Sequence, residues 1–232
     1  MCAAALAWHD RLQPPRYRSV LHRWLASVDT HLDSLQLIPH RTGARSGQVL
    51  EAARGSSQSQ LLNFLAEVDS TYAHQHFLRY RQHFLTSRFG LPGIREASAG
   101  APDVLDIDSG PVLLGVGGAA SIVGRRTMQR YQDTITATGL RNSIEAFGMP
   151  WQHQGQKRYL FGALPIADAF IAWSNSLEVN RASSAAQGWR WAFHGWSMLV
   201  ASLLLLLLRL LRKPMGGTDD TCLHSATLAA QP

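Results

Sequence analysis

The stretch WAFHGWSMLVASLLLLLL, residues 191–208, decides the fold class of this chain. It contains no Asp, Glu, Lys or Arg and ends in the unbroken leucine run 203–208. The hydrocarbon core of a bilayer is spanned by about 20 apolar residues of helix, with a lower limit near 17. Leu210 and Leu211 lengthen the span if the guanidinium of Arg209 extends toward the headgroups. The stretch therefore predicts a transmembrane helix over residues 189–212.

Both ends of this run carry residues that are typical of a membrane interface. Tryptophan precedes and enters it, as in the aromatic belt of membrane proteins, and basic residues close it. The expected anchor consists of Trp191, Trp196, Leu203, Leu208, Arg209, Arg212 and Lys213. The alternative is a buried core helix. That alternative is disfavoured because a helix that is apolar on all sides is rare in a small soluble domain.

The composition of the whole chain excludes several classes of protein. The 232 residues are 46% hydrophobic and only 16% charged, unlike a disordered protein. Cys2 and Cys222 lie near opposite ends, which excludes a disulfide-stapled secreted module. The mean hydropathy of −0.09 excludes a protein with many membrane spans. A helical domain with one anchor is consistent with these values.

The direction of insertion follows from the N-terminus and from the charges around the span. The N-terminal sequence MCAAALAWHDRL has no basic region before its short apolar stretch, which is not the pattern of a secretory signal. The simplest topology is a cytoplasmic domain held to the membrane by its tail. However, Arg209, Arg212 and Lys213 outnumber Arg181 and Arg190 by one charge, and positive charge favours the cytoplasmic side. The orientation is thus left open by the charges.

The residues before the span divide into two expected helical regions. In residues 1–93, apolar side chains recur every three or four positions over 17–37 and again over 58–88, which predicts two long helices. Residues 40–58 are rich in Gly, Ser and Arg and predict a loop. Residues 94–110, with an acidic patch, are expected to be a linker.

The second region is expected over residues 111–188 and contains a glycine-rich apolar segment. A short strand is expected at 111–116, then an amphipathic helical stretch over 125–147 interrupted at Gly139, and a helix over 165–177. Residues 213–232 are expected to be a flexible tail. The predicted fold class is mainly α, a helical domain followed by a single C-terminal transmembrane helix.

The glycine-rich segment allows three interpretations. Gly115, Gly117 and Gly118, with Ala120, fit the pattern G-x-G-x-x-A of a nucleotide-binding loop. Such a site needs a second strand ending in an acidic residue about 20 positions later, whereas 130–147 reads as helix. Small residues four apart instead indicate close helix packing. Because 109–124 is uncharged, a short membrane-inserted hairpin is the third interpretation.

Histidine provides the second candidate site. The chain has ten, but none lie four apart on a helix and no Cys-x-x-Cys is present, so no structural zinc site is expected. The segment with His31, the loop Arg54-Gly55-Ser56-Ser57 and the helix start Leu62-Asn63-Phe64-Leu65 resembles the haem-dependent indoleamine/tryptophan dioxygenases. That resemblance covers less than a fifth of the chain. It implies haem with His31 as axial ligand and with Gly55 and Ser56 as contacts on the substrate side.

No motif for catalysis by a serine nucleophile or for phosphate binding by a P-loop occurs in the chain. Its arginines are scattered along the sequence, which does not indicate a specific nucleic-acid surface. The expected function is therefore docking, assembly or regulation at a membrane, without enzymatic activity. The expected partners are the lipid bilayer and another protein at that membrane. No cofactor is expected unless the haem resemblance holds.

Overall fold

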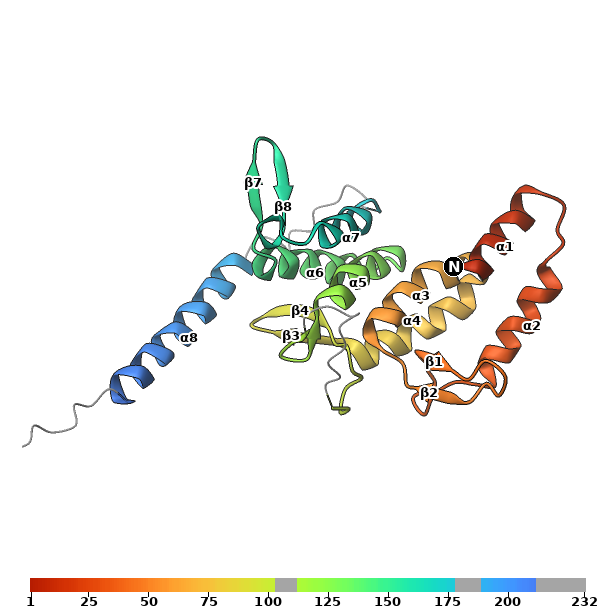
Figure 1. The fold of residues 1–232 in the computed structure, drawn as a ribbon, viewed down its shortest axis with the longest axis horizontal. Coiled ribbons are helices and arrows are strands. Elements are labelled where there is room, and N and C mark those ends of the chain that lie inside the picture. Colours follow the sequence, from red (N-terminus) through yellow and green to blue (C-terminus); the bar gives the residue numbers. More distant parts are fainter. Residues whose placement is uncertain (103–111, 178–188, 212–232) are drawn as a thin grey trace, which may run out of the picture. The chain divides into compact units, whose positions relative to one another are not determined.

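The computed structural model describes residues 1–102, 112–177 and 189–211 (Figure 1). The chain divides into two compact units, Met1–Phe193 and His194–Pro232. The α-helices are α1 (Cys2–Leu12), α2 (Arg18–Asp29), α3 (Gly55–Val68), α4 (Ser70–Phe84), α5 (Gly118–Arg130), α6 (Thr134–Phe147), α7 (Pro165–Asn175) and α8 (Trp189–Leu211). The mainly α fold, with a C-terminal helix long and apolar enough to span a membrane, is confirmed.

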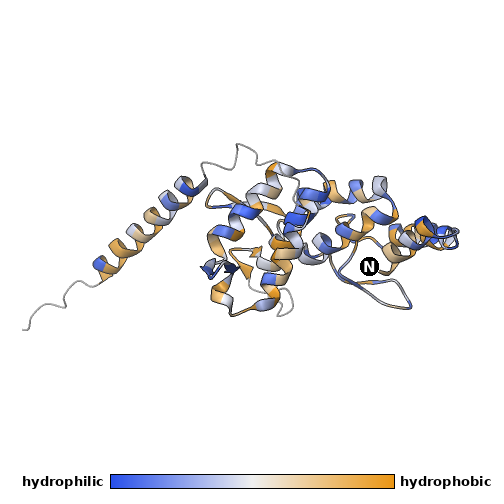
Figure 2. Ribbon diagram, turned by 90° about the horizontal axis from the view of Figure 1, so that it is seen from above, coloured by the Kyte–Doolittle hydropathy of each residue, from blue (hydrophilic) through white to orange (hydrophobic). Residues whose placement is uncertain are grey.

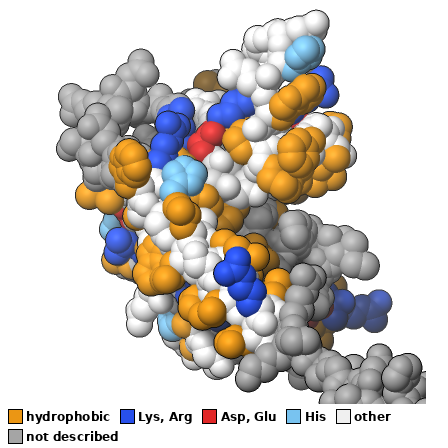
Figure 3. Space-filling view, turned by 90° about the vertical axis from the view of Figure 1, so that its left-hand side faces the viewer, with side chains coloured by type: hydrophobic (Ala, Val, Ile, Leu, Met, Phe, Trp, Pro, Cys, Tyr) orange, Lys and Arg blue, Asp and Glu red, His pale blue; other side chains and the backbone are white. Residues whose placement is uncertain are grey.

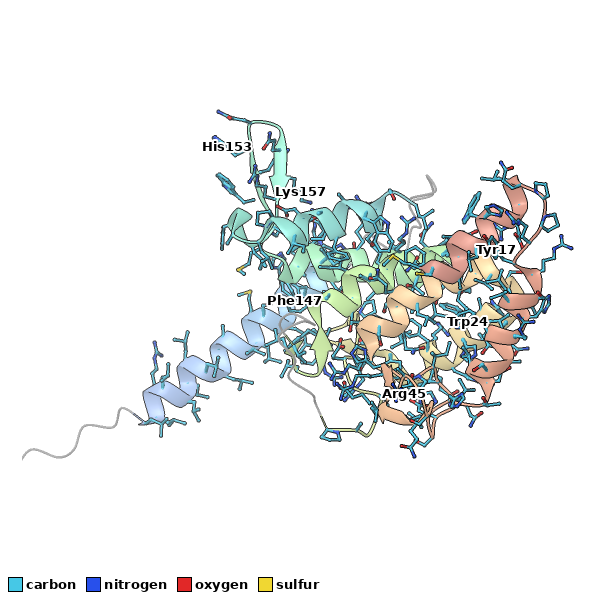
Figure 4. All side chains as sticks on the ribbon, turned by 45° about the vertical axis from the view of Figure 1, so that its right-hand side comes forward. Tyr17, Trp24, Arg45, Phe147, His153 and Lys157 are labelled. Carbon is cyan, nitrogen blue, oxygen red and sulfur yellow. The ribbon has the colours of Figure 1, made fainter. Side chains whose placement is uncertain are left out.

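Strands in the described ranges are short and form two-stranded antiparallel sheets. The pairs are β1 (Arg41–Thr42) with β2 (Val49–Glu51), β3 (Leu85–Arg88) with β4 (Leu91–Ile94), β5 (Val112–Leu113) with β6 (Val116–Gly117), and β7 (Trp151–His153) with β8 (Gln156–Arg158). The β7–β8 hairpin, which carries His153 and Lys157, projects away from the neighbouring helices (Figure 4). Each of these sheets is a single hairpin that connects or flanks the helices.

The core of the first unit lies among α3, α4, α5 and α6, and its centre is partly polar. The hydroxyl of Ser59 on α3 lies 2.6 Å from Tyr80 Oη on α4. The backbone carbonyl of Ser59 accepts hydrogen bonds from Thr127 Oγ1, at 2.7 Å, and from Asn63 Nδ2, at 2.8 Å. Asn63 Nδ2 also donates to Thr127 Oγ1. Buried polar groups cost little free energy when they are paired in this way, so the network ties α3 to α5.

Gly124 allows these helices to approach closely. A Cβ atom built at this position would lie 2.7 Å from Ile94 Cγ1 and 2.8 Å from Tyr80 Oη. No real Cβ tolerates such distances, so only glycine fits without displacing its neighbours. The expectation of close helix packing through the small residues of this segment is thus confirmed for Gly124.

The helix predicted over 17–37 is shorter than expected. It ends at Asp29, and Asp33 forms a compact turn beyond it. The Asp33 carboxylate accepts hydrogen bonds from the backbone N–H groups of Leu35, Leu37 and Ala53. Local side-chain hydrogen bonds of this kind compete with a helix. Leu37 is buried by this turn and not by a helical face. The apolar spacing therefore predicted a helix that extends too far.

The single helix predicted over 58–88 is also wrong, because Asp69 divides it. Asp69 is extended, with φ −150° and ψ 114°, and its carboxylate accepts a hydrogen bond from the N–H of Tyr72. This is a helix N-cap, and it starts α4 directly after α3. The helical periodicity continues through the break because both helices bury a face against the same core. The last predicted residues, 85–88, form β3.

Three further expectations need correction. The expected loop 40–58 contains β1, β2 and the start of α3. The break between α5 and α6 lies at residues 131–133, where Asp133 caps α6, and Gly139 instead packs inside α6 against Pro92. Helix α1 was not expected at all.

The two expected helical regions pack as one compact unit through α3 and α5. Residues 94, 96 and 97 of the expected linker are buried in it. Residues 103–110 and 213–232 lie outside the described parts of the chain.

Candidate functional site: an exposed apolar helix and a buried carboxylate

Helix α8 is long and apolar enough to cross a bilayer. It has 23 residues, and none of its side chains is buried by the protein. Figure 2 shows hydrophobic residues along most of its length. A helix rises about 1.5 Å per residue, so this one measures about 35 Å, slightly more than the hydrocarbon thickness of about 30 Å. Among the described helices it is the one that meets the requirements of a membrane span.

The expected anchor residues fall on this helix as far as the structure describes them. Trp191 is 82% exposed, and Trp196, Leu203 and Leu208 are each about half exposed. Arg209 lies in the last turn, where a cation faces the carbonyl end of the helix favourably. Arg212 and Lys213 lie outside the described residues. The residues described thus present aromatic side chains near the start of the helix, leucines along its second half, and a cation in its last turn.

The first unit also exposes large hydrophobic side chains. Figure 3 shows hydrophobic side chains in groups beside Lys and Arg on one face of the chain, without separating α8 from the first unit. Ile135, Phe161 and Ile166, on or beside α6 and α7, are each more than 60% exposed. Single exposed apolar residues are ordinary, but groups of them are typical of surfaces that meet a partner.

A buried carboxylate joins two of the sequence-predicted sites. Glu96 is 1% exposed, and its Oε1 accepts a 2.5 Å hydrogen bond from Ser56 Oγ in the first turn of α3. Its backbone carbonyl accepts from the N–H of Gly55. A Cβ built at Gly117, the residue before α5, would lie 3.0 Å from Glu96 Oε2. Glu96 therefore lies at the N-termini of both α3 and α5, where helix dipoles favour a negative charge.

Gly55, Ser56 and Gly117 thus share Glu96 as a neighbour within the protein. Gly55 has no space for a side chain, since a Cβ there would lie 1.8 Å from the carbonyl oxygen of Arg95. Glu96 was missed in the sequence because nothing in the segment Ile94-Arg95-Glu96-Ala97 marks one acidic residue as buried. Glu96 is identified only by its contacts with Gly55 and Gly117, which are distant from it in the sequence.

The glycine-rich segment does not form the strand–loop–helix of a nucleotide site. Leu114 and Gly115 both have positive φ, 52° and 78°, and form the two-residue turn of the β5–β6 hairpin. Gly118 is the first residue of α5. The parallel strand that a dinucleotide site needs is not found among the described residues, where every sheet is an antiparallel pair. Nucleotide binding at Gly115, Gly117 and Gly118 stays a prediction.

His31 lies two residues beyond the end of α2 and contacts its last turn. Its Nδ1 is 2.7 Å from the carbonyl oxygen of Ser27 and 2.9 Å from Thr30 Oγ1. Its Nε2 faces the hairpin turn, since a Cβ at Gly47 would lie 2.0 Å from that nitrogen. Haem iron at Nε2 would therefore require the Gly47 turn to move. Haem ligation by His31 stays a prediction, and no group of metal-ligating side chains occurs in the described residues.

Comparison with known protein families gives no match, and comparison with characterised proteins gives none either. The functional argument therefore depends on the geometry of this chain alone.

Proposed function

We propose that this chain is a single-pass membrane protein whose helical domain docks, assembles or regulates another component at that membrane, without catalytic activity of its own. The observation that carries this proposal is α8, a helix of 23 residues that is long and apolar enough to cross a membrane and has no buried residue. In water, a continuous apolar surface of this kind favours association or aggregation. In a bilayer the same side chains meet hydrocarbon, and the helical hydrogen bonds satisfy the backbone.

The proposed role in docking is supported by the nature of the helical domain. A polar network joins α3 to α5 in its core, and its buried Glu96 bonds to the first turn of α3. Its exposed hydrophobic side chains provide contact area for a second protein. We propose that the domain lies on the cytoplasmic side and that this partner is found there.

Membrane fractionation tests the proposal. The full-length chain is expected in the membrane pellet, resistant to extraction with alkaline carbonate and released by detergent. A matched variant lacking residues 189–211 is expected in the soluble fraction with unchanged helical content by circular dichroism. Full-length protein that stays soluble and monodisperse without detergent would contradict the proposal, as would a deletion variant that stays in the pellet as a folded protein.

Orientation has a separate test. An N-glycosylation acceptor sequence placed after residue 232 is expected to be modified in microsomes if the domain lies in the cytoplasm, because the tail then reaches the lumen. An acceptor that stays unmodified there, while one inserted in the exposed β7–β8 turn is modified, would reverse the proposed orientation and leave the membrane span intact.

A further inference from the structure

A cavity of about 310 Å³ lies within the first unit among α1, α3, α5 and α7. Its volume is at the lower end of the range for small-molecule sites. Its lining combines aromatic side chains with arginines. The residues are Met1, Ala4, Ala5, Trp8, Asn63, Phe64, Glu67, Arg126, Arg130 and Trp173. The proposed membrane anchor contributes none of them.

The cavity is bordered by more positive than negative charge. Glu67 forms ion pairs with Arg130 and, at 2.7 Å, with Arg11. Although burial raises the pKa of Glu67, these two arginines outweigh burial and hold that pKa below its usual range, so Glu67 is ionised at neutral pH. Both of its oxygens are occupied by guanidinium groups. Arg126 is a third cation beside them, which leaves the cluster with a formal excess of positive charge.

Arg126 has its charge uncompensated within the described residues. Its Nη1 donates to the backbone carbonyl of Trp173 and to Ser176 Oγ, both at 2.7 Å, and its guanidinium lies 4.4 Å from the centre of the Trp173 ring. No carboxylate pairs with it in the described parts of the chain. Burial and the nearby Arg130 lower the pKa of Arg126, which means that its cationic form is disfavoured there. An anion beside it would relieve that cost.

Two residues that line the cavity, Asn63 and Arg130, each have one buried side-chain atom without a hydrogen-bond partner. Asn63 is 4% exposed, and its Oδ1 has no partner because only Nδ2 is used in the α3–α5 network. The Nε of Arg130 is likewise buried and without a hydrogen-bond partner. Buried polar atoms of this kind are uncommon in folded proteins and are typical of sites where a ligand or water completes the network.

We propose that this cavity binds a small aromatic anion, a single ring system that bears a carboxylate or phosphate group. The anionic group lies against Arg126 and Arg130, where the charge is in excess. The ring lies among Trp8, Phe64 and Trp173, since aromatic side chains favour a planar ring by stacking or edge contact. Because no residue of α8 takes part, the proposal is independent of the membrane proposal.

Binding is measured by isothermal titration calorimetry on the full chain in a neutral detergent, with benzoate and phenyl phosphate as probes. Benzyl alcohol is the neutral control and inorganic phosphate is the control without a ring. At least one aromatic anion is expected to bind at least ten times more tightly than either control. Equal affinity for benzoate, phenyl phosphate and benzyl alcohol would overturn the proposal, because the arginines would then have no role.

The matched variants are Arg126→Gln and Arg81→Gln. Arg126→Gln is expected to weaken binding of the aromatic anion at least tenfold, because it removes the uncompensated cation. Arg81 pairs with Asp133 at a distance of 2.8 Å and does not line the cavity, so Arg81→Gln is expected to leave affinity unchanged. Equal loss in both variants would overturn the proposal.

A third variant covers the case in which Arg126→Gln fails to fold. Trp8 is about half exposed on α1, so Trp8→Leu removes an aromatic wall without disturbing the core. It is expected to weaken binding of the aromatic anion about fivefold and to leave the unfolding temperature of the free protein unchanged. Unchanged affinity in a folded Trp8→Leu variant would contradict the placement of the ring.

A lipid probe separates a soluble ligand from a membrane headgroup. Dihexanoyl phosphatidate, used below its critical micelle concentration, offers the same phosphate chemistry without a ring. If the aromatic anions bind and dihexanoyl phosphatidate does not, the proposal is supported. If dihexanoyl phosphatidate binds through Arg126 and the aromatic anions do not, the site is one for phospholipid headgroups and the proposal for an aromatic ligand is wrong.

Discussion

Helices α5 and α8 differ in where their side chains lie: most of those of α5 are buried, and none of those of α8 is. Most of α5 is buried, including Thr127 and the charged Arg125, whereas α8 is richer in leucine and has no buried residue. The difference lies in polar partners. Thr127 donates to Ser59, and Arg125 Nη1 donates to the carbonyl of Ser174. Thr127 and Arg125 of α5 are thus buried together with their polar partners, whereas the leucines of α8 are exposed on a helix apolar enough to cross a membrane.

The largest expected effect comes from introducing charge into α8. In the double variant Leu204→Arg/Leu206→Arg, each arginine near the centre of the span costs about 2.5–3.5 kcal/mol of insertion free energy. We expect the protein to leave the carbonate-resistant membrane fraction. The matched double variant Leu204→Ala/Leu206→Ala is expected to stay in it. If the arginine variant stays membrane-inserted, α8 is not a span.

A medium effect is expected from pH, and it acts on the helical unit only. His76 on α4 is 1% exposed and lies 4.6 Å from the Tyr72 ring. Burial, reinforced by the Arg79 charge and opposed by Asp29, lowers the pKa of His76 to about 4 from 6.5. The unfolded chain therefore binds the proton more readily. Stability is full above pH 6.5 and falls as the pH drops toward 4, by about 3 kcal/mol in total.

Urea unfolding in detergent at pH 7, 6, 5 and 4 measures this loss, and His76→Gln is expected to flatten the slope between pH 6.5 and 4. Glu67 and Glu145, whose pKa values lie below the usual range, contribute their loss only below about pH 4.5. Carbonate-resistant membrane association is expected to be the same for wild type and His76→Gln. A slope that persists in His76→Gln would assign the acid sensitivity to another group.

The smallest of the three effects comes from the close approach of α5 to α3 and α4. Gly124→Ala places a Cβ against Ile94 and Tyr80 Oη and is expected to lower the free energy of unfolding by about 1–3 kcal/mol. Gly195→Ala on α8, where no atom lies within 4 Å of the added Cβ, is the control and is expected to have no such effect. Helix propensity alone favours Ala over Gly by about 1 kcal/mol, so a Gly124→Ala variant that is as stable as wild type or more stable would contradict the packing argument.

Elements that depend on one continuous run of residues could be predicted from the sequence. Features that depend on contacts between distant residues could not. The long apolar helix α8 could be predicted because the criteria are length and absence of charge. The helix at 165–177 was predicted nearly to its observed bounds, with Pro165 in the first turn of α7. Helix ends at Asp29 and Asp69 were missed, because carboxylates that bond to the backbone interrupt the helices without interrupting the apolar spacing.

The candidate sites were harder to predict than the helices, because their residues are distant in the sequence. Gly55, Ser56 and Gly117 were singled out for two unrelated ligands, yet they surround one carboxylate, that of Glu96. The cavity beside Arg126 draws its lining from residues as far apart as Met1 and Trp173, and no local pattern marks it. Helix α1 could have been found from Ala4, Ala7 and Trp8, whose spacing of three and four predicts a helical face.

The exposed thiol of Cys2 lies next in sequence to Met1, which borders the cavity. A chain in which Cys222 is replaced by Ser would therefore accept a single environment-sensitive fluorophore at the mouth of that cavity. Ligand binding to the cavity could then be followed by the emission of the fluorophore on Cys2, in detergent and in vesicles alike.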